Sequence, residues 1–151
     1  MRIPSDISGT VIGTEPLVFV IGESVDVGAR PTLARLATLP WVIKPRGTGT
    51  REVLEAELAR QGLALGRYSE VRDENLQLSL IARGLGVALV TRRSIERHPY
   101  ARRVRLVKIR PLDVNLHVVM IRHPHLGNLG AAADVLEKQL QARYAQPRAR
   151  G

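Results

Sequence analysis

The chain consists of short apolar runs that alternate with segments of helical pattern, and this alternation limits its fold most strongly. Its longest apolar runs are residues 17–21, 87–90 and 118–121. Each is rich in β-branched residues and is flanked by glycine, proline or polar residues, which is typical of buried strands. Further strands are expected at 41–44, 68–71 and 104–109, and the strand that contains 118–121 is expected to begin at 116. Strands that alternate with helices indicate an α/β protein, and their order favours a mostly parallel sheet.

The helical segments carry recognisable boundary residues. The candidate N-caps are Thr32, Thr50, Asp73 and Asn128, for helices that run to Thr38, to about Gln61, to Arg83 and through Leu140. Gly84 follows the third helix, at the position where a left-handed residue is favoured. We expect residues 1–15 to be irregular, because Pro4, Gly9 and Gly13 interrupt any period.

Composition excludes several classes of protein. The length of 151 residues allows about one compact domain. The absence of cysteine excludes disulfide scaffolds, thiolate zinc sites and cysteine nucleophiles. No apolar run approaches the roughly 20 residues that span a bilayer, and the first 20 residues hold no block of signal-peptide type. We therefore expect a cytoplasmic protein without membrane contact.

A glycine-rich loop, Lys44–Arg51, follows one expected strand and opens the next expected helix. Its two glycines let backbone N–H groups approach a ligand, its two threonines add hydroxyl groups, and its three cations favour an anion. It is not a Walker A loop, because no Lys-Ser/Thr pair follows the second glycine at the required spacing. The alternative is a strand-to-helix turn with solvated arginines. The candidate ligand-binding residues are Arg46, Gly47, Thr48, Gly49, Thr50 and Arg51.

Other motifs favour structural roles. Asp73–Asn75 is best explained by helix capping. The glycines within Arg83–Val90 lie between a helix and a strand, the reverse of the order in a dinucleotide-binding motif, and indicate a tight turn. His123 and His125 lack a third metal ligand at suitable spacing, and no catalytic arrangement is present. We therefore expect no enzyme, no metal site and no cofactor.

A block of basic residues lies in the second half of a chain whose formal net charge is +9. Only Glu96 opposes this block. Two interpretations remain open: a solvated strand face, or contact with the phosphates of a nucleic acid. The block consists of Arg92, Arg93, Arg97, Arg102, Arg103, Arg105, Lys108 and Arg110.

Four segments in order resemble the effector-binding domain of LysR-type transcriptional regulators. They are 15–20, 36–43, 47–51 and 81–90, and the likeness extends over residues 11–142. The resemblance implies a type 2 periplasmic-binding-protein-like α/β fold. Two subdomains are then joined by two crossing strands, and a small effector binds in the cleft between them.

The resemblance also implies a division of this chain. Residues 17–113 correspond to one complete subdomain, residues 1–16 and 114–145 to part of the other, and residues 146–151 to a disordered tail. The likeness is truncated on its N-terminal side, and these 151 residues contain no helix-turn-helix, through which such regulators contact DNA. We expect the uncovered edge of the partial subdomain to cause self-association.

The resemblance implies that the chain senses a small effector, and the helix dipole, hydroxyl groups and arginines of the loop agree with an anion of the carboxylate or sulfate class. The effector would contact residues 46–50, with Arg51 behind them, and would bias the closure of the subdomains. The two alternatives are a basic module that contacts nucleic acid and an oligomerisation module without a ligand. The expected hinge residues are Val20, Gly22, Leu112 and Val114.

Overall fold

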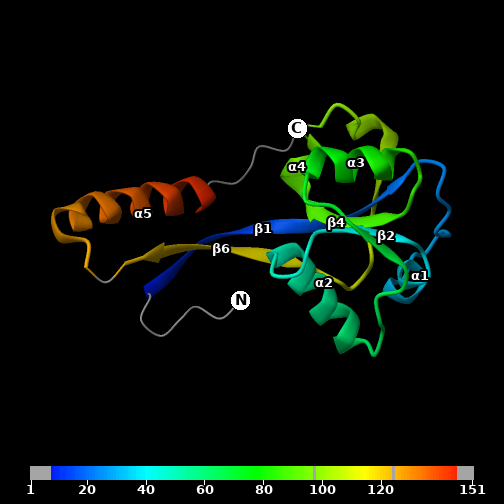
Figure 1. Cartoon of the computed structure of the whole chain (residues 1–151), viewed down its shortest axis with the longest axis horizontal. Helices are drawn as coiled ribbons and strands as arrows, with labels where there is room; N and C mark the ends of the chain where they lie inside the picture. Colours follow the sequence, from blue (N-terminus) through cyan, green and yellow to red (C-terminus); the bar gives the residue numbers. More distant parts are fainter. Residues whose placement is uncertain (1–7, 97, 124, 146–151) are drawn as a thin grey trace. The chain divides into compact units, whose positions relative to one another are not determined.

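The computed structural model describes residues 8–96, 98–123 and 125–145 (Figure 1). The chain divides into two compact units. Unit 2 is Pro16–Leu116, and unit 1 comprises Met1–Glu15 and His117–Gly151. The sequence placed these boundaries after residues 16 and 113. The expected disordered tail lies outside the described residues.

Helices and strands alternate, which confirms the α/β class. The elements of unit 2 are α1 (Leu33–Ala37), β2 (Trp41–Ile43), α2 (Gly49–Arg60), β3 (Tyr68–Glu70), α3 (Glu74–Ala82), β4 (Val87–Thr91), α4 (Arg92–Glu96), the 3-10 turn η1 (Ala101–Arg103) and β5 (Val104–Val107). Two strands run through both units, and these are β1 (Ser8–Gly22) and β6 (Asn115–Arg122). Unit 1 also holds the 3-10 turn η2 (Gly127–Leu129) and α5 (Gly130–Ala145).

The sheet is mixed, so the expectation of a mostly parallel sheet is wrong. Its strand order is β3-β2-β4-β1-β5, and β6 pairs with β1. Strand β2 runs parallel to β3 and β4, whereas β1 runs antiparallel to β4 and β5. The reason is the entry point of β1: its Leu17 pairs with Thr91, the last residue of β4. Strand β1, which enters from unit 1, is therefore antiparallel to β4 and β5 of unit 2.

Residues 8–15 form the first half of β1, so the expectation of an irregular segment at 1–15 is wrong for this part. Burial does not alternate regularly here: Val11 is 55% exposed, and the buried residues are Ile12 at 8% and Glu15 at 6%. The partner strand β6 begins at Asn115. Pairing over such a separation leaves no local signal when glycines interrupt the pattern, because strand formation depends on cross-strand packing. Residues 1–7 lie outside the described residues.

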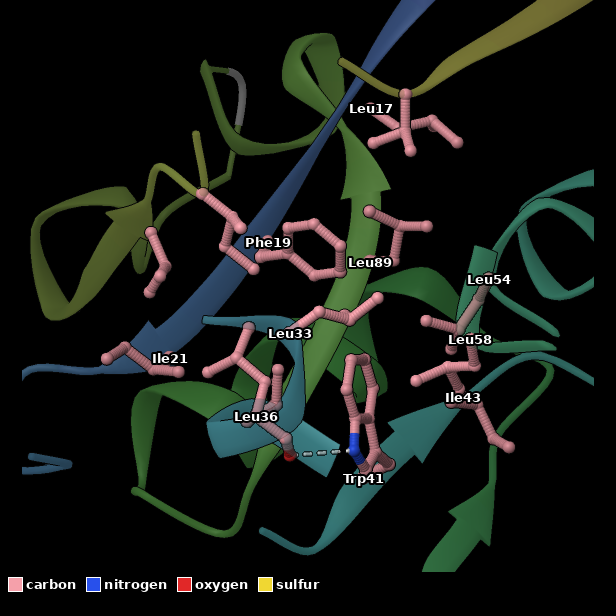
Figure 2. Packing of buried hydrophobic residues seen from close by; sticks show 14 of the residues in the cluster. Leu17, Phe19, Ile21, Leu33, Leu36, Trp41, Ile43, Leu54, Leu58 and Leu89 are labelled. Carbon is pink, nitrogen blue, oxygen red and sulfur yellow. Dashed lines mark hydrogen bonds between the residues drawn. The ribbon is translucent and has the colours of Figure 1, made fainter. Parts of the chain in front are cut away.

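The core of unit 2 lies on both faces of the sheet. One cluster joins α1 and α2 to Phe19, Trp41 and Leu89 (Figure 2), and the other joins α3 and α4 to Val20 and Ala88. Phe19 and Trp41 meet edge to face with ring centroids 6.2 Å apart. Alternate residues of β1 thus enter opposite layers, as the period of two requires.

The helix boundaries confirm several sequence predictions. Thr32 Oγ1 accepts a hydrogen bond from the backbone N–H of Arg35 at 3.1 Å. Asp73 Oδ1 accepts one from Leu76 N–H at 2.7 Å. Gly84 has a φ of +77°, the left-handed conformation expected after α3. Helices α1 and α3 therefore begin after the N-cap residues that the sequence predicts, and α3 ends before the predicted glycine.

Unit 1 has little core of its own. Arg122 on β6 ties the strand to α5 through an ion pair with Asp134 at 2.6 Å and a second one with Glu137. Within the described part of this unit, Ile12 is the only apolar side chain in the buried class, and α5 buries none. Two strands and a helix with so little buried surface are marginally stable by themselves.

Candidate functional site

The glycine-rich loop connects the end of β2 to the start of α2. Gly47 has a φ of +82°, which favours glycine. Thr48 is the N-cap, with an extended backbone, and its Oγ1 donates a 2.7 Å hydrogen bond to the carbonyl of Pro45. The prediction of Thr50 as the N-cap is wrong by two residues, because Thr48 supplies the first helical carbonyl, to Glu52 N–H at 3.0 Å.

The first turn of α2 presents hydrogen-bond donors. The N–H groups of Gly49, Thr50 and Arg51 precede the first residue with an intrahelical acceptor. The side chain of Thr48 does not cap these N–H groups, because its hydroxyl donates to the carbonyl of Pro45 within the loop. The positive end of the helix dipole lies at the same point, so the turn attracts an anion. Glu52, in the same turn, already interacts with other groups.

Arg51 is part of the support behind the loop. Its side chain is 1% exposed, and its Nε donates to Glu55 Oε1 at 2.5 Å. Its Nη1 donates to the carbonyl of Lys44 at 3.3 Å, and the guanidinium lies 4.8 Å from the ring centroid of Tyr68. Burial lowers the pKa of Arg51, but its bonds to Glu55 and Tyr68 raise it by more, so the pKa lies above its usual value. This charge fixes β2, β3 and α2 together.

The other cations of the loop differ from Arg51. Arg46 is exposed, and no ion pair or side-chain hydrogen bond of Arg46 occurs within the described residues. Lys44 Nζ donates to the carbonyl of Arg72 at 2.7 Å. The cation available to a ligand at this loop is therefore Arg46.

The space behind the loop is filled. The gap between β2 and the start of α2, lined by Lys44, Thr50 and Arg51, has no room for water. A Cβ at Gly49 would lie 2.5 Å from Leu116 Cδ1, so Leu116 closes the space beside the helix start. The loop therefore offers a ligand its outer surface rather than this gap.

The expected hinge residues divide into two groups. Val20 and Gly22 lie within the sheet of unit 2, opposite Leu106 and Val104 of β5. Val114 accepts a 2.9 Å hydrogen bond from Leu17 N–H through its carbonyl, and Leu112 packs against the larger core cluster. The chain passes between the units after Glu15 and after Leu116.

Sequence reasoning missed the partners of Arg51. Glu55 lies four residues later on α2, and this helical spacing was a usable signal. Glu70, 3.8 Å from Arg51, and Tyr68 lie on β3 and were not predictable from spacing. Gln77 was also missed: it is 1% exposed, and its Nε2 donates to the carbonyl of Val42 at 2.8 Å.

Two other expectations concern the rest of the described chain. The rings of His123 and His125 meet edge to face with centroids 5.9 Å apart, and the described residues hold no group of three side chains suited to a metal ion. No helix in the described part of the chain is long and apolar enough to cross a membrane.

Curated relatives match only part of the chain and a small part of their own length. The "Phosphonates import ATP-binding protein PhnC" of Anaeromyxobacter dehalogenans is 32% identical over 114 residues, which is 73% of this chain and 23% of that protein. The "Uncharacterized HTH-type transcriptional regulator YeiE" of Escherichia coli is 30% identical over 82 residues, 54% of this chain and 28% of that protein. The chain thus spans about a quarter of the length of these relatives.

Solved structures and a protein family match most of the chain. The regulatory domain of CcmR from Synechocystis PCC6803, in complex with 2-PG, has a TM-score of 0.78 at 15% identity and covers 96% of this chain and 71% of that one. The effector-binding domain of BenM with its effector benzoate has a TM-score of 0.74 at 18% identity, with 98% and 70% covered. These likenesses show the fold, which is periplasmic-binding-protein-like. The LysR substrate binding domain family matches residues 3–144, and the chain belongs to this family.

Proposed function

We propose that this chain senses a small anionic effector at the outer surface of the loop between β2 and α2. The observation that carries the proposal is the first turn of α2. Its backbone N–H groups receive no capping hydrogen bond from the side chain of Thr48, which bonds to Pro45 instead. An anion at this point accepts hydrogen bonds from the backbone and is favoured by the helix dipole. Exposed Arg46 adds a charge, and Arg51 holds the turn in place.

The effector class follows from these donors. Carboxylate, sulfate and phosphonate groups all present several acceptor oxygens to N–H groups. The similar solved structures contain benzoate and 2-PG, and one curated relative is named for phosphonate import. We include all three anion types in the proposal and expect the organic part of the effector to set selectivity. The chain acts by binding rather than by catalysis.

A thermal-shift screen tests the effector site. The 151-residue chain is heated with benzoate, methylphosphonate, phosphate or sulfate, and with benzamide as the uncharged match of benzoate. A ligand at about 100 times its Kd stabilises a protein by about 2.7 kcal/mol. We expect one anion to raise the Tm in a saturable way and benzamide to have no effect.

Variants then locate the site. Thr48→Ala with Thr50→Ala is expected to abolish the shift, because the loop loses the Thr48 hydrogen bond to Pro45 and both hydroxyls. The control Thr32→Ala removes the N-cap side chain of α1 and so destabilises unit 2 without touching the loop. Binding that survives the double change contradicts this location of the site. The variants are expected to retain a cooperative melt, and such a melt excludes unfolding as the cause of a lost shift.

We also propose that unit 1 mediates self-association. The support is its apolar surface: Ile121, Val135 and Leu136 are 47%, 56% and 48% exposed. Exposed apolar surface of this kind favours a second copy as its cover. Light scattering of the chain is expected to give a dimer or larger mass, and Val135→Lys with Leu136→Lys is expected to give a monomer. A monomeric wild-type chain contradicts this part of the proposal.

A further inference from the structure

Most of the net charge of the chain is concentrated around one edge of the sheet. Residues 92–110 contain eight of the 23 lysines and arginines but one of the 14 acids, Glu96, and therefore supply seven of the nine net positive charges. We define the basic edge as those of these cations that are exposed and that have no ion pair or side-chain hydrogen bond within the part of the chain that the structure describes. They are Arg92, Arg102, Arg103, Lys108 and Arg110.

The fold brings Arg92, Arg102, Arg103 and Lys108 together at β5, whereas Arg110 lines a separate hollow with Glu57 and Asp113. This strand ends the sheet order, beyond β1. Ile95 of α4, Ala101 of η1 and Val104 of β5 belong to one packed cluster, so the three elements lie side by side. Arg92 and Lys108, which are 16 residues apart in the sequence, line the same hollow of about 340 Å³, and Asp113 also lines it.

The basic edge lacks acidic partners. No ion pair or side-chain hydrogen bond of its five members occurs within the described residues. Arg51, Arg60 and Arg122 behave differently, since each is paired with a carboxylate. Arg105 is not a member, because its Nη2 donates to the carbonyl of Val25 at 2.8 Å.

The positions of these cations are not explained by a need to prevent the edge strand β5 from pairing with other chains. Cations within an edge strand prevent it from pairing with other chains. The only cation inside β5 is Arg105, whereas Arg103 precedes the strand and Lys108 follows it. The unpaired charges thus surround the strand instead of lying along it. From Arg103 to Lys108 the chain advances about 16 Å, at about 3.3 Å per residue.

We propose that the basic edge binds the sugar-phosphate backbone of duplex DNA. Duplex DNA carries one phosphate charge per about 1.7 Å of helix axis, so a surface of this extent meets several phosphates. Unpaired arginines are suited to phosphate because their planar groups donate two parallel hydrogen bonds. Such contacts confer affinity and orientation without reading the base sequence. Binding at this edge is independent of the effector site.

Salt dependence tests the proposal. Affinity of the full chain for a random-sequence duplex of about 30 base pairs is measured by fluorescence anisotropy at several salt concentrations. Four phosphate contacts, from the members that lie together at β5, predict a slope of log K against log salt of about −4. Arg102→Gln, Arg103→Gln and Lys108→Gln together are expected to reduce its magnitude by about 3. A slope near zero overturns the proposal.

A matched triple variant distinguishes DNA binding by the basic edge from attraction by the net charge of the whole chain. Arg30→Gln, Arg72→Gln and Arg83→Gln remove the same charge from exposed positions elsewhere in unit 2 and are expected to leave the slope unchanged. An equal loss in both triple variants overturns the assignment to the basic edge. Binding to phosphatidylglycerol vesicles but not to the duplex at the same salt overturns the assignment to DNA.

The wild-type chain offers a second test that needs no variant. Its only lysines are Lys44, Lys108 and Lys138. Acetylation followed by mass spectrometry is expected to show that the duplex protects Lys108 and leaves Lys138, which is exposed on α5, as reactive as before. Protection of Lys138 with no protection of Lys108 overturns the proposal.

Discussion

Leu54→Ala tests whether the cluster that holds α2 against the sheet stabilises unit 2. Leu54 is 1% exposed and lies in the same apolar cluster as Trp41 (Figure 2). Removing the three carbons beyond Cβ from such a position loses their transfer free energy and leaves a cavity. The expected loss in the free energy of unfolding is about 3 kcal/mol.

The assay uses a reporter that the chain already contains. Trp41 is the only tryptophan, is 1% exposed, and donates through Nε1 to the carbonyl of Leu36 at 3.1 Å. Urea unfolding followed by Trp41 fluorescence therefore reports the exposure of this cluster. We expect a lower midpoint with an unchanged slope, which is the signature of lost stability rather than changed compactness.

A matched leucine provides the control. Leu76 on α3 is 51% exposed, so Leu76→Ala removes the same atoms without creating a cavity. Its expected effect is within about 0.5 kcal/mol. If Leu54→Ala costs less than about 1 kcal/mol, or if the two variants cost the same, the burial argument is refuted.

Three further predictions follow from single positions. Gly86 has a φ of +149°, and a Cβ there would meet the backbone of Pro40, so Gly86→Ala is expected to cost at least about 2 kcal/mol in urea unfolding; an unchanged midpoint would contradict this. Arg51→Met removes the bonds to Glu55 and Lys44 and is expected to cost about 1–3 kcal/mol and to weaken anion binding in calorimetry, whereas unchanged affinity would deny Arg51 its supporting role. The hydrogen bond from Arg60 holds the pKa of Glu57 below its usual value, so its stabilisation is present at neutral pH and is lost as pH falls through the folded-state pKa. The difference in unfolding free energy between wild type and Glu57→Gln should therefore vanish in acid, and a difference that is constant with pH would contradict the sign.

Local features of the sequence predicted much of unit 2. Thr32, Asp73 and Gly84 mark helix ends through interactions within a few residues, and the structure confirms all three. The buried runs at 17–21 and 87–90 are also strands, as predicted from a local feature: each run is apolar on both faces. The order of these signals also identified the family, which the match over residues 3–144 confirms.

Features that depend on distant partners were not predictable. Residues 8–15 become a strand by pairing with β6, and the direction of β1 follows from its entry beside Thr91. Arg51 sits behind the loop because Glu70 and Tyr68 of β3 meet it there. The N-cap is Thr48 rather than Thr50, because the carbonyl of Thr48 accepts the first helical hydrogen bond, from Glu52 N–H.

The central claim is that the first turn of α2 binds the anionic group of an effector. Amide correlation spectra of the ¹⁵N-labelled chain, titrated with benzoate, methylphosphonate, phosphate and sulfate, test it most directly. We expect one of these anions to shift the amide signals of Gly49, Thr50 and Arg51 in a saturable way, and benzamide to leave them unchanged. If none of the four anions moves these three signals, or if benzamide moves them equally, the claim is contradicted.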